Sequence, residues 1–187
     1  MDALFGGSFD PVHVGHLVAA EAVADALDLH VRLLPAREQP FKWSGHRATP
    51  EQRVAMLQLA VAGNPRLSVE PIELTLPTPS YTVTTLRALA GREPGNRFTL
   101  LLGADAAAEL AAWYQVDALP ALADVVVFAR PGAPLPRHAA IRRVVEVPAV
   151  DVSATMIRER VRQARSIRYL VPDAVRDYIA ARGLYRE

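Results

Sequence analysis

The first 35 residues read as a strand, a glycine-rich turn, a helix and a second strand, and this order constrains the fold more than any other feature. Residues 2–5 form a short apolar strand that Gly6-Gly7 interrupts. Residues 14–29 have the apolar spacing of a helix with one buried face. Residues 31–34 form the second strand, which Pro35 ends. Such a unit implies two parallel strands joined by a right-handed crossover.

The same alternation continues along the chain. Further strands are predicted at 67–70, 98–102, 125–128 and 144–147, and helices at 50–62, 81–90, after Gly103, 153–165 and 172–182. The strands contain few polar residues, which is typical of a parallel sheet covered on both faces. We therefore expect an α/β fold, a Rossmann-like doubly wound parallel sheet with helices on both faces and a small C-terminal helical portion. Residues 1–187 are expected to form one domain, with a core at 1–150 and C-terminal helices at 151–187.

The composition excludes several classes of protein. The chain has no cysteine, which rules out a disulfide scaffold and thiolate chemistry. Its longest apolar runs are shorter than the roughly 20 residues that a membrane span requires. No secretory signal is visible at the amino terminus. We therefore expect a cytoplasmic protein without a membrane partner.

Positive charge is concentrated toward the C-terminus, although the net charge of the chain is only +1. From Arg130 onward there are 12 arginines and 6 acidic residues. This surplus is compatible with nucleic-acid binding, or with solvated helix faces that include one or two phosphate-binding arginines. The absence of a Lys/Arg run and of interleaved aromatic residues favours the second interpretation, so no nucleic-acid partner is expected.

Residues 6–16, with the sequence GGSFDPVHVGH, lie where the first strand ends and the first helix begins. Doubly wound sheets bind ligands at this edge, and helix N-termini attract phosphates. Glycines at 6 and 7 let backbone amides approach a phosphate, and Gly15 leaves room for a triphosphate. His13 and His16 are three residues apart on a helix, so both rings can face one ligand. A metal-binding pair, for which no third ligand is apparent, and a purely structural role are the alternatives.

The sequence at 13–16 resembles the motif of the HxGH nucleotidyltransferase superfamily, and the longer string at 6–16 is most similar to the bacterial nicotinate-mononucleotide adenylyltransferases. Phosphopantetheine adenylyltransferases, which usually have Thr in place of His13, and glycerol-phosphate cytidylyltransferases, which are shorter, are less similar. The resemblance implies that His13 and His16 are catalytic. It also implies that ATP contacts Gly6, Gly7, Ser8, Phe9 and Gly15.

The loop at residues 35–42 resembles a proline-rich loop of the same family that ends in His-Lys. Phe41 stands here where the family often has the histidine, whereas Lys42 is retained. The resemblance implies that Lys42 binds substrate through a phosphate, and the alternative is an exposed loop lysine.

Residues 79–83 (PSYTV) resemble the PSYT segment of the family at the start of a helix, where free N–H groups are available. In the family, backbone amides near the threonine help to hold the pyridine carboxylate of the acceptor. This similarity assigns substrate binding to Tyr81 and Thr82. The alternative is a simple Ser/Thr helix cap.

Residues 103–105 (GAD), followed by Trp113-Tyr114, resemble the GAD…W segment of the family. The resemblance implies that Gly103 allows close approach of a nucleotide and that Asp105 accepts hydrogen bonds from a ribose. Trp113 is expected to stack on the pyridine ring beside Tyr114. The alternative for Trp113 is core packing.

Residues 152–158 (VSATMIR) resemble the ISSTxIR motif of the family, with Ala154 in place of its second serine. Ser153 reads as a helix N-cap, and Thr155 and Arg158 follow in the first turns. The resemblance implies that these three residues hold the β- and γ-phosphates of ATP, with Arg158 counted as catalytic. The alternative is an ordinary capped helix with a surface arginine.

The resemblance implies an enzyme that transfers the adenylyl group of ATP to nicotinate mononucleotide, giving nicotinate adenine dinucleotide and pyrophosphate. Positioning and charge stabilisation dominate such transfers, so no covalent intermediate is expected. Mg²⁺ is expected to be bound mainly through the ATP phosphates, without a dedicated protein site. The alternatives are nicotinamide mononucleotide or another phosphorylated acceptor, and a non-catalytic nucleotide-binding regulatory module. Homo-oligomerisation is left open.

Overall fold

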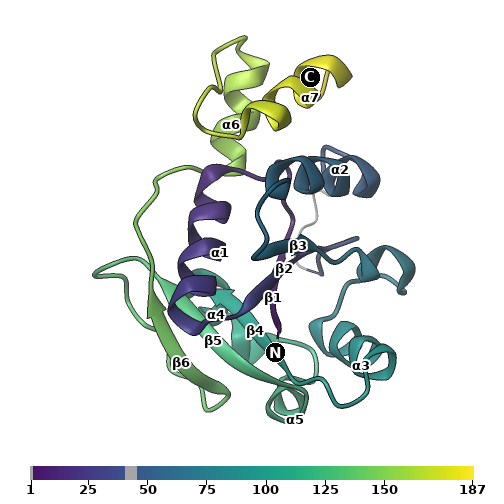
Figure 1. Cartoon of the computed structure of the whole chain (residues 1–187), viewed down its shortest axis with the longest axis vertical. Helices are drawn as coiled ribbons and strands as arrows, with labels where there is room; N and C mark the ends of the chain where they lie inside the picture. Colours follow the sequence, from purple (N-terminus) through teal and green to yellow (C-terminus); the bar gives the residue numbers. More distant parts are fainter. Residues whose placement is uncertain (1, 41–45) are drawn as a thin grey trace.

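The computed structural model describes residues 2–40 and 46–187, in which strands and helices alternate (Figure 1). The strands are β1 (Asp2–Gly7), β2 (His30–Pro35), β3 (Leu67–Val69), β4 (Phe98–Gly103), β5 (Ala123–Ala129) and β6 (Ile141–Glu146). The helices are α1 (Val14–Leu27), α2 (Pro50–Val61), α3 (Thr82–Arg92), α4 (Ala104–Ala108), α5 (Leu119–Leu122), α6 (Ala154–Arg162) and α7 (Asp173–Arg182). Short 3₁₀ turns occur at η1 (Ile72–Thr75), η2 (Leu110–Ala112) and η3 (Val116–Ala118).

Within the described residues, six strands form one sheet in the order β3-β2-β1-β4-β5-β6, and all neighbouring pairs are parallel. The chain starts at β1 in the middle of the sheet, moves outward to β3, and then crosses back to β4 and moves outward to β6. The direction of winding therefore reverses between β1 and β4, where a crevice opens at the carboxyl ends of the strands. This topology confirms the predicted Rossmann-like doubly wound fold.

Alternate residues of the central strands β1, β4 and β5 point to opposite faces of the sheet and enter two separate cores. Ala3 and Phe5 of β1 pack in the core that contains residues of α1, α2, α6 and α7. Leu4 lies between them in sequence and packs in the other core, with residues of α3, α4 and α5. These strands are apolar on both faces of the sheet because helices cover both faces. Figure 1 shows α6 and α7 at the end of the molecule toward which β1 runs.

The start of α2 follows from its local sequence. Thr49 is the N-cap: its Oγ1 accepts a hydrogen bond from the N–H of Gln52 at 3.3 Å, and the Gln52 side chain accepts one from the N–H of Thr49 at 2.9 Å. Pro50 occupies the first helical position, where its missing N–H costs nothing. This reciprocal capping explains why the prediction of a helix beginning at residue 50 is confirmed.

The structure differs from the sequence prediction mainly in the lengths of elements. The helix predicted after Gly103 is short, and two 3₁₀ turns follow it, so the segment between β4 and β5 is folded as several brief turns. The last strand begins at Ile141 rather than at residue 144, because its pairing with β5 extends to Val125 across an irregularity. The helix predicted at 14–29 ends at Leu27, since Asp28 adopts a left-handed conformation (φ 51°).

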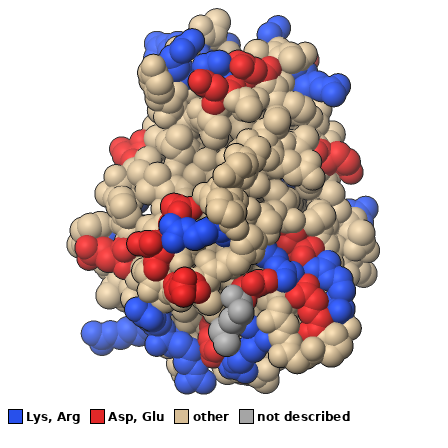
Figure 2. Space-filling view, in the orientation of Figure 1, with Lys and Arg blue, Asp and Glu red and all other residues tan. Residues whose placement is uncertain are grey.

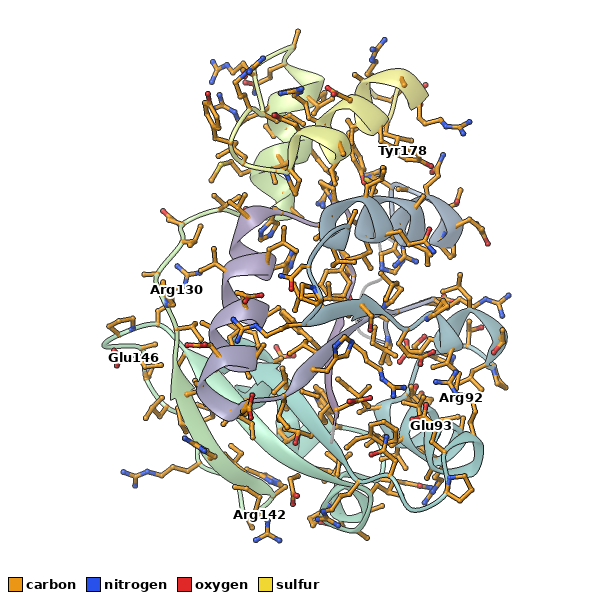
Figure 3. The ribbon with its side chains drawn as sticks, viewed as in Figure 1. Arg92, Glu93, Arg130, Arg142, Glu146 and Tyr178 are labelled. Carbon is orange, nitrogen blue, oxygen red and sulfur yellow. The ribbon has the colours of Figure 1, made fainter. Side chains whose placement is uncertain are left out.

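An ion cluster lies near the amino ends of the central strands, away from the crevice. Arg32 of β2 contacts Asp2 and donates to Glu93 at 2.7 Å, while Arg92 contacts Glu70. Figure 3 shows Arg92 and Glu93 together at the end of α3. The hydrogen bonds from Arg32 lower the pKa of Glu93 to about 2. The two arginines are paired with three carboxylates of the same cluster, which indicates a structural role.

Charged residues of both signs alternate over the face seen in Figure 2, without a large area of one sign. Several C-terminal arginines are paired locally: Arg162 lies 2.6 Å from Glu159, and Arg176 lies 2.5 Å from Asp173, each pair three residues apart on a helix. The positive surplus of the C-terminal third is thus partly compensated by helix neighbours. Of the helices that the structure describes, none combines the length and the apolar character needed to cross a membrane.

Candidate functional site

The β1–α1 loop (residues 8–13) delivers the two motif histidines to the N-terminus of α1. His13 is the N-cap residue, and its ring is stacked on the ring of His16, with centroids 3.7 Å apart and an interplanar angle of 24°. The backbone N–H of His13 donates to Nδ1 of His16 at 3.3 Å. Because Nδ1 accepts, the donor atom of the His16 ring is Nε2.

Burial determines the charge of His13. Its side chain is only 7% exposed, and desolvation lowers its pKa from 6.5 to about 4. Its Nδ1 has no hydrogen-bond partner among the described residues. A neutral ring can stack closely on His16 without charge repulsion, and it offers one N–H donor and one acceptor nitrogen to a ligand. The predicted pair is therefore present with the two rings held together.

The glycines of the motif differ in what a side chain at their position would contact. A Cβ at Gly7 would lie 2.9 Å from Cζ of Phe9, and a Cβ at Gly15 would lie 3.1 Å from Nδ1 of His13. Gly7 and Gly15 thus leave space for side chains of the loop itself, in addition to the ligand space expected from the sequence. A Cβ at Gly6 would meet nothing within 4 Å, and Gly6 is open to the cavity described below.

The loop is held in place by aromatic packing and by a buried arginine. Phe9 is buried and meets the rings of Phe5 and His16 edge-on, at centroid distances of 5.6 and 4.9 Å. The hydroxyl of Ser8 donates to Oε1 of Gln39 at 2.6 Å. Arg53 of α2 is fully buried, and its Nη1 donates to the carbonyl oxygen of Ser8 at 2.8 Å. A loop fixed on both sides keeps the histidines that follow it in one geometry.

The C-terminal motif folds next to the same loop. Ser153 caps α6 by accepting from the N–H of Met156 at 3.1 Å, as expected from the sequence. Nη2 of Arg158 donates to Oγ1 of Thr155 at 3.1 Å, and its Nη1 donates to the carbonyl oxygen of Asp10 at 2.7 Å. Arg158 therefore joins the start of α6 to the β1–α1 loop, 148 residues earlier in the chain.

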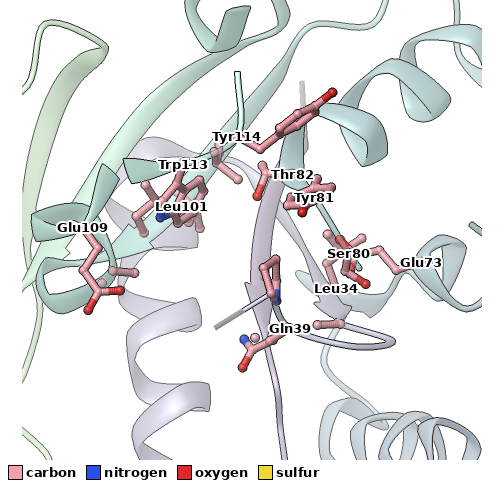
Figure 4. A pocket seen from close by; sticks show the side chains of 18 residues that line it. Leu34, Gln39, Glu73, Ser80, Tyr81, Thr82, Leu101, Glu109, Trp113 and Tyr114 are labelled. Carbon is pink, nitrogen blue, oxygen red and sulfur yellow. The ribbon is translucent and has the colours of Figure 1, made fainter. Parts of the chain in front are cut away.

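A cavity of about 400 Å³ opens at the carboxyl ends of β1, β2 and β4 (Figure 4). Ser80, Tyr81 and Thr82 lie on one wall, and Trp113 faces them from another. The ring of Tyr81 lies against that of Tyr114, with centroids 4.6 Å apart. The remaining lining residues are Gly6, Gly7, Leu34, Ala36, Gln39, Pro40, Glu73, Leu100, Leu101, Leu102, Gly103, Ala106 and Glu109.

The cavity wall contains an acidic residue that the sequence analysis did not single out. Glu73 of η1 is buried, and one of its carboxylate oxygens accepts from Oγ1 of Thr85 at 2.8 Å. Burial raises the pKa of Glu73, while the hydrogen bonds from Thr85 and Ser80 oppose this rise. Thr85 lies one turn inside α3, so Glu73 ties the start of that helix to η1. No local motif reveals such a contact between residues 12 apart.

The predicted site residues fall into two adjoining groups. His13, His16 and Arg158 lie beside the β1–α1 loop and are not among the cavity-lining residues, whereas the aromatic residues and Gly103 line the cavity. Gly6 and Gly7 belong to both groups. Asp105 is exposed at the start of α4 and does not line the cavity, although Ala106 and Glu109 of the same segment do. Lys42 and Phe41 lie outside the described residues.

The donor atoms of the site do not form a protein-built metal centre in the part of the chain that the structure describes. In the stretches 2–40 and 46–187, no group of three or more histidine, aspartate or glutamate side chains is arranged to hold an ion. The stacked histidines are therefore better suited to hydrogen bonding than to forming a protein-built metal cage.

Comparison with known proteins identifies the family of the chain. Residues 4–160 match the model of the cytidylyltransferase-like family. A protein of Roseiflexus sp. named "Probable nicotinate-nucleotide adenylyltransferase" is 46% identical over 193 residues, covering 98% of this chain and 96% of that protein. A protein of the same name from Thermus thermophilus is 44% identical over 184 residues, with 98% of each chain covered.

The fold is also found among solved structures. The Plasmodium falciparum nicotinic acid mononucleotide adenylyltransferase complexed with NaAD superimposes with a TM-score of 0.81, covering 98% of this chain and 96% of that chain. Its sequence is only 16% identical, so this likeness concerns the fold alone. The family match and the near-full-length curated relatives carry the assignment. The chain therefore belongs to the cytidylyltransferase-like family and is a relative of its nicotinate-nucleotide adenylyltransferases.

Proposed function

We propose that this chain transfers the adenylyl group of ATP to nicotinate mononucleotide, releasing pyrophosphate and nicotinate adenine dinucleotide. One observation carries the proposal: a histidine–arginine cluster and a cavity with aromatic walls adjoin each other at Gly6 and Gly7. The cluster offers donors for phosphates, and the cavity offers flat surfaces for a planar ring. The names of the relatives support the same reaction.

The reaction is a direct in-line displacement at phosphorus. An oxygen of the acceptor 5′-phosphate forms a bond to the α-phosphorus of ATP, while the bond from that phosphorus to the bridging β-oxygen breaks and the electron pair leaves with pyrophosphate. Nε2–H of His16 contacts the α-phosphate and stabilises the charge that develops there. His13 contacts the β-phosphate side of ATP.

Arg158 holds the leaving pyrophosphate together with Thr155 and Ser153. The geometry supports this role, because Arg158 already contacts Thr155 and Asp10 and thus spans the gap between α6 and the β1–α1 loop. A guanidinium group suits phosphate because its planar fork can donate two parallel hydrogen bonds. Lys42 is proposed as a further phosphate contact, and only the sequence supports this role.

The acceptor binds in the cavity. Trp113 stacks on the pyridine ring, with Tyr114 beside it, and the backbone amides of Tyr81 and Thr82 at the start of α3 bind the carboxylate. The N-terminal position of Thr82 in α3 supports this assignment, because the first N–H groups of a helix have no partner within it. The N–H of Tyr81 donates to the carbonyl oxygen of Pro79 at 2.9 Å, so it must leave this partner to bind the carboxylate. Gly103 allows the nucleotide to approach, and Asp105 accepts from a ribose hydroxyl.

Mg²⁺ accompanies ATP in this proposal, held mainly by phosphate oxygens and water. The lack of a three-ligand cluster within the described residues suits an ion of this kind. When bound, the ion neutralises charge on the phosphates. Residues 1–187 act as one domain in which 151–187 complete the phosphate site, and the proposed location of the enzyme is the cytoplasm.

The test is pyrophosphate release from ATP and Mg²⁺, with nicotinate and nicotinamide mononucleotides measured in parallel. A strong preference for the nicotinate form is expected, since the amides of α3 favour a negative group. Equal or reversed preference would remove the carboxylate-binding role of Tyr81 and Thr82 while retaining adenylyl transfer. No turnover with either acceptor would overturn the proposed substrate and favour another acceptor or a regulatory role.

A further inference from the structure

Asp10 of the β1–α1 loop has a side chain with several partners, and this carboxylate has no part in the chemistry proposed for the site. Its side chain is 4% exposed. One carboxylate oxygen accepts from the N–H of Arg47 at 2.6 Å, and the other accepts from the N–H of Ala48 at 3.1 Å and from the hydroxyl of Tyr185 at 2.7 Å. Asp10 thereby joins the loop to the segment before α2 and to the end of the chain.

The chain end reaches Asp10 through a helix-terminating turn. Gly183 follows α7 with a positive φ of 63°, and the N–H of Leu184 donates back to the carbonyl oxygen of Ile179 at 3.1 Å. This pattern is a Schellman ending, which reverses the chain after a helix. It directs Tyr185 inward, where its side chain is only 9% exposed and its hydroxyl meets Asp10, 175 residues away in sequence.

The backbone of Asp10 has a second function, because its carbonyl oxygen accepts from Nη1 of Arg158. Asp10 therefore accepts hydrogen bonds from the C-terminal segment at two places. Its carboxylate accepts from Tyr185, and its backbone carbonyl accepts from Arg158. A shift of Asp10 would move the arginine contact and the start of α1 together. His13, three residues later, would change its position relative to Arg158.

We propose that Asp10 and Tyr185 are positioning residues. Their hydrogen bond ties the β1–α1 loop to the segment after α7, so that the two histidines and Arg158 contact the same phosphates. This inference rests on the proposed adenylyl transfer. Neither residue touches the reacting atoms, so each acts through the geometry of Arg158 and His13. Misplacement of a reacting group by about 1 Å can reduce turnover by up to two orders of magnitude.

The first test replaces Tyr185 by Phe, which removes only the hydroxyl. We expect kcat to fall about tenfold, because hydrogen bonds to carboxylates are the stronger ones, while KM for both substrates changes less than about twofold. Tyr178→Phe is the matched control, because it removes the same atom from a ring of α7, which is labelled in Figure 3. That ring packs against Arg182 and not against Asp10. An unchanged kcat in Tyr185→Phe, or an equal fall in the control, would overturn the proposal.

A double-mutant cycle separates positioning from a general loss of stability. Tyr185→Phe is combined with Arg158→Lys, and kcat is measured well below the melting temperature of each variant. If Tyr185 acts through Arg158, the factor lost by Tyr185→Phe shrinks in the Arg158→Lys background. If the two factors simply multiply, the residues act independently and the inference is wrong.

A measurement without turnover separates this inference from the proposed function. Amide hydrogen exchange of the peptide covering residues 6–13 is expected to accelerate in Tyr185→Phe and to remain at the wild-type rate in Tyr178→Phe. Unchanged exchange would overturn the positioning role even if the wild type is active. Faster exchange in a protein that turns over neither acceptor would retain the positioning contact and reject only the proposed substrate.

Discussion

The buried neutral His13 makes a quantitative prediction about stability at acid pH. Its pKa is lowered from 6.5 to about 4 in the folded protein, so between these values the unfolded chain binds a proton that the folded chain does not. Stability must therefore fall as the pH falls through this window. We predict that the wild type loses free energy of unfolding below pH 6.5 relative to His13→Gln, which cannot titrate.

The magnitude follows from the size of the shift. A full shift from 6.5 to about 4 corresponds to about 3 kcal/mol, and at pH 5 about 2 kcal/mol of it has been lost. Urea unfolding of both proteins at pH 8, 7, 6 and 5 measures the difference directly, and titrating groups that do not contact His13 cancel in it. The difference is expected to be constant at pH 7–8 and to shift by about 2 kcal/mol at pH 5.

A difference between the two proteins that does not change with pH would refute the reasoning. It would mean that His13 is protonated as readily in the folded protein as in the unfolded chain. The stacked geometry with His16 would then need a compensating anion. The pH profile at 7–8 serves as the internal control, because His13 is neutral in the folded protein and mostly neutral in the unfolded chain there.

Three further predictions concern the site and its support. His16→Ala should lower turnover by at least about 10²-fold with little change in KM for ATP, because it removes a donor to the transition state; a near-normal rate would contradict the mechanism. Glu73→Ala should raise KM for the acceptor with little effect on KM for ATP, whereas Glu73→Gln, which can still accept from Thr85, should be milder; equal effects would argue against the hydrogen bond as the cause. Arg53→Met should lower the free energy of unfolding by roughly 3–5 kcal/mol in urea titrations, since buried carbonyl groups lose their donor; a loss below about 1 kcal/mol would refute its structural role.

Local pattern was sufficient for the parts of the site that lie within one strand–turn–helix unit. The position of residues 6–16 at the edge of the sheet follows from an apolar strand before it and a helix after it. The N-caps at Thr49 and Ser153 likewise depend on atoms three residues apart. Such features are visible in sequence because the interacting groups are neighbours along the chain.

The structural roles of several motif residues can be recognised only in the folded protein. Gly7 accommodates the ring of Phe9, and Gly15 accommodates the ring of His13, whereas the sequence analysis assigned both only to ligand space. Asp105 was assigned to the ribose by resemblance, yet its exposed position outside the cavity lining leaves that role a proposal. Side-chain direction depends on packing that a motif does not encode.

The sequence by itself determined the parallel doubly wound sheet, the glycine-rich loop with its two histidines and the capped helix that carries Arg158. The period of apolar residues and the short-range capping groups act over a few residues, so they can be recognised without coordinates. Only the tertiary structure decided that Arg53 would be buried under Ser8, and that Tyr185 would bind Asp10. These contacts join residues far apart in sequence, and a hydrogen bond across such a distance depends on the packing of the whole chain.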